Sequence, residues 1–158
     1  MRNIAAVTML VAATVTARAE IVSPPPVDAQ SAVMMVRYAL IALDQANKSN
    51  NYAVLRDLGT PNFREGNPTA RLAELFAAHR QVGLNLASAV VVEPTWTVPP
   101  ARDTTGLLRL NGTFTAPSGQ TRFDIVMQAV GSGWQLAGIA VSAQPKILAA
   151  SQVCAPAK

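Results

Sequence analysis

Few side chains in this sequence could do acid–base chemistry. His79 is the only histidine among 158 residues, and because an imidazole titrates near neutrality it could serve as a general base. Tyr38 and Tyr52 are the two tyrosines, and the hydroxyl of Tyr38, if directed into a pocket, could stabilise an oxyanion. Sequence spacing places no acid beside His79, so no catalytic residue is predicted.

These residues also have a purely structural interpretation, which we favour. His79 lies near the end of a helical pattern, where its ring could pack and interact with the helix C-terminus. Tyr38 lies among apolar residues of a longer helical pattern, as a core tyrosine does when its hydroxyl reaches the rim. A single histidine and a single cysteine argue against a structural zinc site. We expect neither a metal nor a cofactor.

The charged residues exclude two classes of partner. The chain has 13 basic and 9 acidic residues, and the basic ones are scattered singly, so neither nucleic acid nor an anionic membrane surface is an expected partner. Arg109, Arg122 and Asp124 lie on the polar faces of predicted neighbouring strands. They could recognise an acidic ligand, although cross-strand ion pairs on a solvated sheet face are the commoner explanation.

The first 19 residues have the pattern of a secretory signal peptide. Arg2 supplies a small basic region, residues 4–16 are uncharged and mostly apolar, and Ala17-Arg18-Ala19 fits an A-x-A cleavage site. The apolar run is too short for a membrane span, which takes about 20 residues. We expect cleavage after Ala19, secretion into a bacterial periplasm, and no integral membrane segment in the mature chain.

The remaining residues form one domain between two extended segments. Residues 20–27 contain three consecutive prolines and are expected to be a linker. Residues 28–144 are the predicted domain, and residues 145–158 are expected to be a flexible tail. Cys154 lies in that tail, so we favour a free thiol there over an intermolecular disulfide.

Helical patterns fill the first half of the domain. Asp28 is a plausible N-cap for a helix reaching about Lys48, with apolar residues at helical spacing over most of its circumference. A short second helix follows Asn51, and Gly59 ends it. A third is expected from the Asn67-Pro68 pair to about Gln81. We expect the long first helix to lie across the concave face of a sheet.

Strand patterns fill the second half. The valine run 90–92 and the proline-flanked Trp96 predict an irregular first strand at a sheet edge. Two turn signals, at residues 117–119 and 131–133, divide residues 106–142 into three antiparallel strands. Helices followed by an antiparallel meander indicate an α+β fold with three helices and four strands. The residues predicted to face one side of the first two meander strands are Leu108, Leu110, Phe114, Phe123, Ile125 and Met127.

The closing stretch FDIVMQAVGSGWQLAGIAV, the long first helix and the segment NYAVLRDLGTPNFRE together resemble the NTF2-like superfamily of cone-shaped α+β domains. The resemblance covers about residues 28–142 and concerns the fold, so it transfers no chemistry. It implies a curved sheet that wraps the helices and leaves an apolar cavity at the open end. Its enzymes place a pair of polar residues in the cone, and no pair here matches such a motif.

The apolar cavity that the resemblance implies, together with the lack of a convincing catalytic constellation in the sequence, favours a non-catalytic function. We expect a domain that binds a small apolar or amphipathic ligand in the cone or serves as an envelope interaction module. One alternative is an isomerase or dehydratase-like enzyme that uses Tyr38, His79 or an acid in the cone. Another is a structural homodimer formed through the sheet, with Leu107 and Val126 exposed on the outward face. The cavity-lining candidates are Tyr38, Phe76, His79, Trp96, Phe114, Met127 and Trp134.

Overall fold

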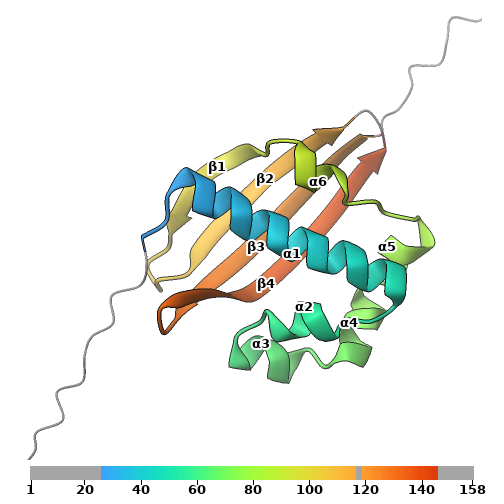
Figure 1. The fold of residues 1–158 in the computed structure, drawn as a ribbon, viewed down its shortest axis with the longest axis horizontal. Helices are drawn as coiled ribbons and strands as arrows, with labels where there is room; N and C mark the ends of the chain where they lie inside the picture. Colours follow the sequence, from blue (N-terminus) through green and yellow to red (C-terminus); the bar gives the residue numbers. More distant parts are fainter. Residues whose placement is uncertain (1–25, 117–118, 146–158) are drawn as a thin grey trace, which may run out of the picture.

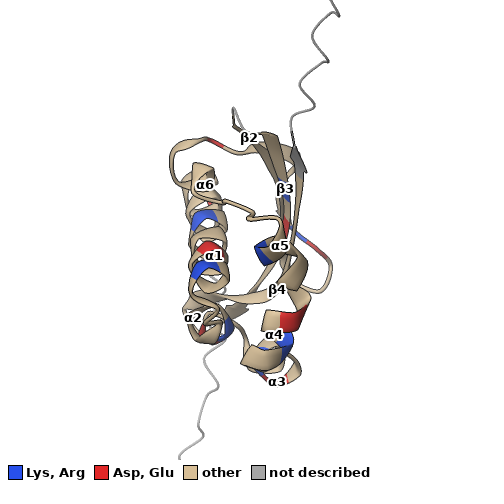
Figure 2. Ribbon diagram, turned by 90° about the vertical axis from the view of Figure 1, so that its right-hand side faces the viewer, with Lys and Arg blue, Asp and Glu red and all other residues tan. Residues whose placement is uncertain are grey.

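The computed structural model describes residues 26–116 and 119–145. Four antiparallel strands form one open sheet, and the helices cover only one of its faces (Figures 1 and 2). The strands are β1 (Thr95–Arg102), β2 (Leu108–Ala116), β3 (Gly119–Val130) and β4 (Gly133–Pro145), in the spatial order of the chain. This arrangement confirms the α+β class and the four-stranded meander.

Helix α1 (Ala29–Ser49) crosses the covered face of the sheet (Figure 1). The Asp28 carboxylate caps it by accepting a 2.6 Å hydrogen bond from the Ser31 N–H. At the other end Asn50 takes a left-handed conformation with φ of 53°, which stops the helix. The side of α1 that faces the sheet buries Val36, Leu40 and Leu43 completely.

The predicted alternation along the meander is confirmed. Leu108, Leu110 and Phe114 on β2 and Phe123 and Ile125 on β3 are at most 1% exposed. Since successive strand residues point to opposite faces, the residues between them form the uncovered outer face. Their register places Asn111 opposite Asp124 and Thr113 opposite Arg122.

The prediction of three helices is wrong, because the described residues contain six. After α1 come α2 (Ala53–Asp57), α3 (Pro61–Gly66), α4 (Thr69–Leu75), α5 (Ala77–Gln81) and α6 (Ser88–Val91). Thr60 starts the unpredicted α3 by accepting a 3.1 Å hydrogen bond from the Phe63 N–H, with Pro61 at the first helical position. The expected third helix is interrupted at Phe76, whose non-helical backbone separates α4 from α5.

The valine run is also not a strand. Val90 and Val91 belong to α6, and β1 begins only at Thr95. Arg37 of α1 stabilises this short helix by donating hydrogen bonds to the Ala89 and Val92 carbonyls. β-Branched residues favour strands only weakly, so these tertiary contacts decide the local conformation. The irregularity predicted near Trp96 is present, since the β1–β2 register shifts on both sides of Val98.

The α2–α3 connection fastens the small helices to the sheet. Leu136 of β4 donates a 2.9 Å hydrogen bond to the Leu58 carbonyl and accepts a 2.8 Å bond from the Thr60 N–H. Part of the β4 edge is thereby paired, which removes an exposed row of backbone groups.

Several predicted segments lie outside the described residues. They are the signal peptide, most of the linker, and the part of the tail that contains Cys154. β4 continues to Pro145, where the tail was expected to begin. In the part of the chain that the structure describes, no helix combines the length and apolarity needed to cross a membrane.

Candidate functional site

A network of polar side chains joins α1, α2 and α5 around the hydroxyl of Tyr52. Tyr52 is 1% exposed and directly precedes α2. Its hydroxyl donates a 2.7 Å hydrogen bond to Asn47 Oδ1 near the end of α1. It also accepts a 2.5 Å hydrogen bond from Arg80 Nη1 on α5. The hydroxyl is thus paired on both sides, and it connects residues 33 positions apart in the chain.

Aromatic packing extends this network to His79. The Tyr52 and Phe76 rings stack with centroids 6.1 Å apart, and the Phe76 and His79 rings are 5.5 Å apart. His79 Nε2 lies 2.8 Å from the Val141 carbonyl oxygen of β4. A carbonyl only accepts, so Nε2 carries the proton, and in the neutral ring Nδ1 is left as an acceptor.

A buried carboxylate stands one helical turn before Asn47. Asp44 is 4% exposed and accepts hydrogen bonds from Lys48 Nζ at 2.6 Å and from the Leu86 N–H at 3.0 Å. Buried charges require such partners. Asp44 therefore fixes the position of Lys48 and of the chain that leads from α5 to α6.

These residues border a depression of about 350 Å³, which we call the α1–α5 depression. It is lined by Asn47, Lys48, His79, Arg80, Gly83, Leu84 and Asn85. Two buried polar atoms of its lining residues, Asn47 Nδ2 and His79 Nδ1, have no hydrogen-bond partner among the described residues. Asn47 Nδ2 is a donor, and His79 Nδ1 is an acceptor when the ring is neutral. Buried polar groups are normally paired, so this pair points to a missing bonding partner.

The α1–α5 depression carries a positive balance of charge. Lys48 and Arg80 line it, and the only carboxylate in the network described above is that of Asp44, which is already paired with Lys48. One donor of the Arg80 guanidinium is used by Tyr52, and the group also lies 5.6 Å from the Tyr52 ring centroid. A guanidinium has five N–H donors, so Arg80 retains capacity for an anionic acceptor.

The structure places the predicted cavity residues at several positions in the described part of the chain. Tyr38 is 61% exposed and lines a different depression, over the first turns of α1. Phe76, Phe114 and Met127 belong to the packed core. Of the seven candidates, His79 alone lines the α1–α5 depression.

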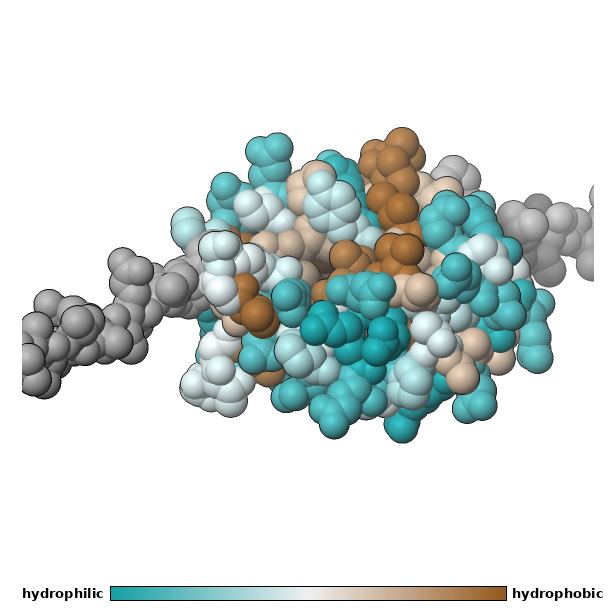
Figure 3. Space-filling model, turned by 60° about the horizontal axis from the view of Figure 1, so that its bottom comes forward, coloured by the Kyte–Doolittle hydropathy of each residue, from teal (hydrophilic) through white to brown (hydrophobic). Residues whose placement is uncertain are grey.

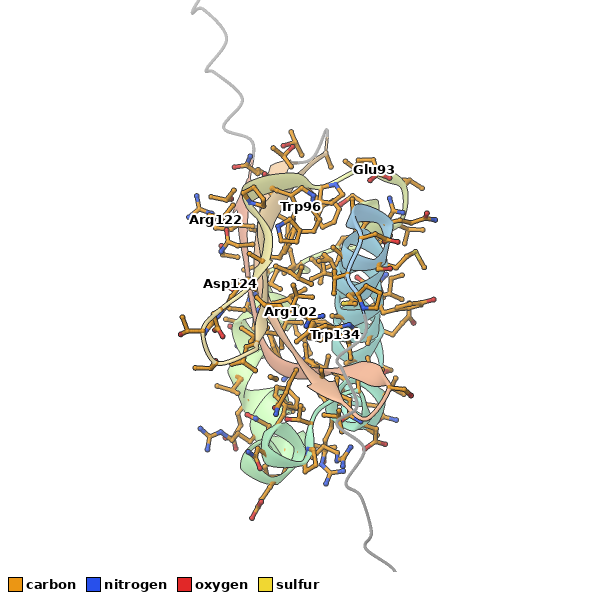
Figure 4. All side chains as sticks on the ribbon, turned by 90° about the vertical axis from the view of Figure 1, so that its left-hand side faces the viewer. Glu93, Trp96, Arg102, Arg122, Asp124 and Trp134 are labelled. Carbon is orange, nitrogen blue, oxygen red and sulfur yellow. The ribbon has the colours of Figure 1, made fainter. Side chains whose placement is uncertain are left out.

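The two tryptophans lie between the sheet and α1 (Figure 4). Trp96 packs edge-on against Phe123 with centroids 5.9 Å apart. The Arg102 guanidinium carbon lies 5.0 Å from the centroid of the Trp134 ring. The buried Nε1 of Trp134 has no hydrogen-bond partner in the described part of the chain. Both tryptophans are therefore partly buried residues that pack against the hydrophobic core.

Sequence reasoning missed Asn47 and Arg80 and gave Tyr52 no role. Asn47 and Tyr52 are five residues apart across a helix end, and this spacing was the only local signal. Arg80 stands beside the histidine that was singled out. Its contact with Tyr52 depends on how α5 packs, which no spacing reveals.

The sequence suggested ion pairs between neighbouring strands on the outer sheet face. The ion pair that Arg109 forms is a different one. Arg109 pairs with Asp103 at 3.1 Å. The Thr105 hydroxyl, backbone N–H groups and Arg109 all donate hydrogen bonds to Asp103, and they lower the pKa of its carboxyl from 3.8 to about 2. These bonds and the ion pair with Arg109 let Asp103 hold its loop in place.

Among the described residues, no group of three or more histidine, cysteine or acidic side chains could hold a metal ion. No protein-family model, no curated protein and no solved structure matches this chain. Its function is therefore inferred from its own geometry.

Proposed function

We propose that this protein binds a small amphipathic anion, such as a short carboxylate with an apolar stem, in the α1–α5 depression. The observation that carries the proposal is a pair of buried atoms, Asn47 Nδ2 and His79 Nδ1, which have no hydrogen-bond partner among the described residues and belong to residues that line a cationic depression. A volume of about 350 Å³ suits a small molecule.

The chemistry of the lining residues supports an anion. Arg80 and the Asn47 amide both donate, and a carboxylate accepts two such bonds in one plane. A hydroxyl on the same ligand could donate to His79 Nδ1. Leu84 offers an apolar contact for the stem.

Binding has more support than catalysis. The enzyme alternative required Tyr38 and His79, or one of them with an acid, to converge in one cavity. Tyr38 and His79 line separate depressions. The only acid of the polar network is Asp44, which is bonded to Lys48 and the Leu86 N–H. The described contacts thus leave the histidine without a carboxylate partner.

The NTF2-like relationship and the secreted location are part of the same proposal. A long first helix across a four-stranded meander supports the relationship. The buried side chains of the covered sheet face favour a ligand site beside the core over an empty apolar cone.

Titration with hexanoate tests the proposed site. Amide proton–nitrogen correlation spectra should show saturable shifts at Lys48, Gly83 and Asn85, while the neutral hexanol should produce much smaller ones. Losing one charge-assisted hydrogen bond should weaken hexanoate binding about tenfold or more in Arg80→Gln. The matched control Arg71→Gln changes an exposed arginine of α4 and should bind normally.

Equal shifts with hexanol, or unchanged hexanoate binding in folded Arg80→Gln, would overturn the anion site. Near-ultraviolet circular dichroism of the variant shows whether its core packing is intact.

A further inference from the structure

The uncovered face of the sheet contains a second depression, which we call the outer-face depression. Its volume is about 470 Å³. The residues that line it are Thr97, Val98, Pro99, Ala101, Arg102, Asp103, Arg109, Asn111 and Asp124. The irregular strand β1 forms one wall, because the register shifts around Val98 and two prolines interrupt its pairing with β2.

This wall is apolar. Val98 is 59% exposed on an edge strand, and Pro99 and Ala101 continue the same surface. An exposed apolar wall beside polar groups is typical of a contact site for a ligand or partner.

The opposite wall contains the carboxylate of Asp124. Asp124 is exposed on β3, and among the described residues it forms no hydrogen bond or ion pair. Asn111 stands directly opposite it on β2 and lines the same depression. Residues in such cross-strand positions have Cβ atoms about 5 Å apart, so a single ligand group can contact both.

The two arginines that line the outer-face depression, Arg102 and Arg109, contact other residues. Arg109 is paired with Asp103. The Arg102 guanidinium lies over the Trp134 ring, on the helix side of the sheet (Figure 4). Arg122 and Asp124 lie on the opposite side, away from the helices (Figure 4), and form no ion pair with each other. Among the described residues that line this depression, Asp124 is thus a carboxylate that forms no ion pair.

We propose that the outer-face depression binds an alkylammonium group, with the cation on Asp124 and Asn111 Oδ1 and the apolar stem along Val98 and Pro99. A carboxylate and an amide oxygen both accept from an ammonium group, which has three donors. The same chemistry is offered by a free amine and by a lysine side chain of a polypeptide.

Titration with n-butylammonium chloride tests this site, with n-butanol as the neutral control of equal stem length. Saturable amide shifts are expected at Val98, Asn111 and Asp124, and n-butanol should cause little change. Removing a charge-assisted bond in Asp124→Asn should weaken binding about tenfold or more. The matched control Asp57→Asn alters an exposed acid of α2 and should bind normally.

A capped Ala-Lys-Ala peptide separates the two sources of the cation. Tighter binding of the peptide assigns the site to a polypeptide, and equal affinity assigns it to a free amine. Equal shifts with n-butanol, no saturable shift with either cation, or unchanged affinity in Asp124→Asn would overturn the proposal.

Discussion

Tyr52 connects the core to the proposed site through two hydrogen bonds of one hydroxyl. Tyr52→Phe keeps the ring that stacks on Phe76 but removes the partner of Asn47 Oδ1 and of Arg80. Leaving such groups unpaired should lower the free energy of unfolding by about 1–3 kcal/mol, measured by urea denaturation. Tyr38→Phe is the matched control, since Tyr38 is exposed, and it should change stability little. Equal stability of both variants would contradict the role given to the Tyr52 hydroxyl.

Asp103 makes the stability of the folded protein depend on pH in the acidic range. Its carboxyl has a pKa of about 2 in the folded chain, held down chiefly by the Thr105 hydroxyl, against an ordinary value of 3.8. A depressed folded pKa stabilises the protein above the ordinary value, and this contribution is lost as pH falls from about 4 to about 2. As the pH falls over that range, the melting temperature of Asp103→Asn should therefore fall less steeply than that of the wild type.

The control for this pH experiment is Asp124→Asn, which removes a carboxyl that has no hydrogen-bond partner among the described residues. Its melting curve should follow the wild-type dependence on pH. A wild-type slope in Asp103→Asn would mean that the hydrogen bonds to Asp103 do not stabilise the folded chain.

Among the elements, the close approach of β1 to β2 depends on a glycine. A Cβ atom built on Gly112 would lie 2.6 Å from the Thr95 carbonyl oxygen and 2.8 Å from the Phe123 ring. Gly112→Ala should therefore destabilise the protein by about 1–3 kcal/mol through overpacking. Gly133→Ala on β4 meets nothing within 4 Å and should be nearly neutral. Thermal denaturation of the two variants compares them, and similar losses would contradict the close approach of β1.

The elements differ in how far the sequence predicted them. Period-two alternation identified the inward residues Leu110 and Phe123 correctly, because one face of the sheet is buried and the register follows from it. The short helices were harder, since α3 depends on the Thr60 cap and α6 on hydrogen bonds from Arg37, 52 residues away from Ala89. The local sequence pattern carries no information about contacts between residues that far apart in the chain.

The same limit applies to the candidate site. His79 was recognisable as the single histidine, but Asn47 of α1 and Arg80 of α5 are connected through the Tyr52 hydroxyl, which depends on how the helices pack. Tyr38 was expected in the cavity because its helix is apolar over most of its circumference. The sheet covers one side of α1 only (Figure 1), and the Tyr38 side chain is 61% exposed. On the face in Figure 3, apolar residues run from the top edge into the middle and form a smaller separate group toward the left, and hydrophilic residues cover most of the rest.

At the scale of the whole molecule, the proposed export predicts a processed chain. If residues 1–19 are a signal peptide, N-terminal sequencing of the mature protein from its host should begin at Glu20. Replacing Ala19 with arginine should block cleavage and leave a longer product, whereas Ala13→Ser, outside the cleavage motif, should be processed normally. A mature protein that retains Met1 would contradict the export proposal.

The α1–α5 depression is proposed to hold a small anion. Native mass spectrometry of the wild type, Arg80→Gln and Arg71→Gln, purified from the host without denaturation, tests it most directly. We expect a small-molecule adduct on the wild type and on Arg71→Gln that organic extraction removes, and no adduct on Arg80→Gln. An adduct-free wild type, or an equal adduct on folded Arg80→Gln, would contradict the claim.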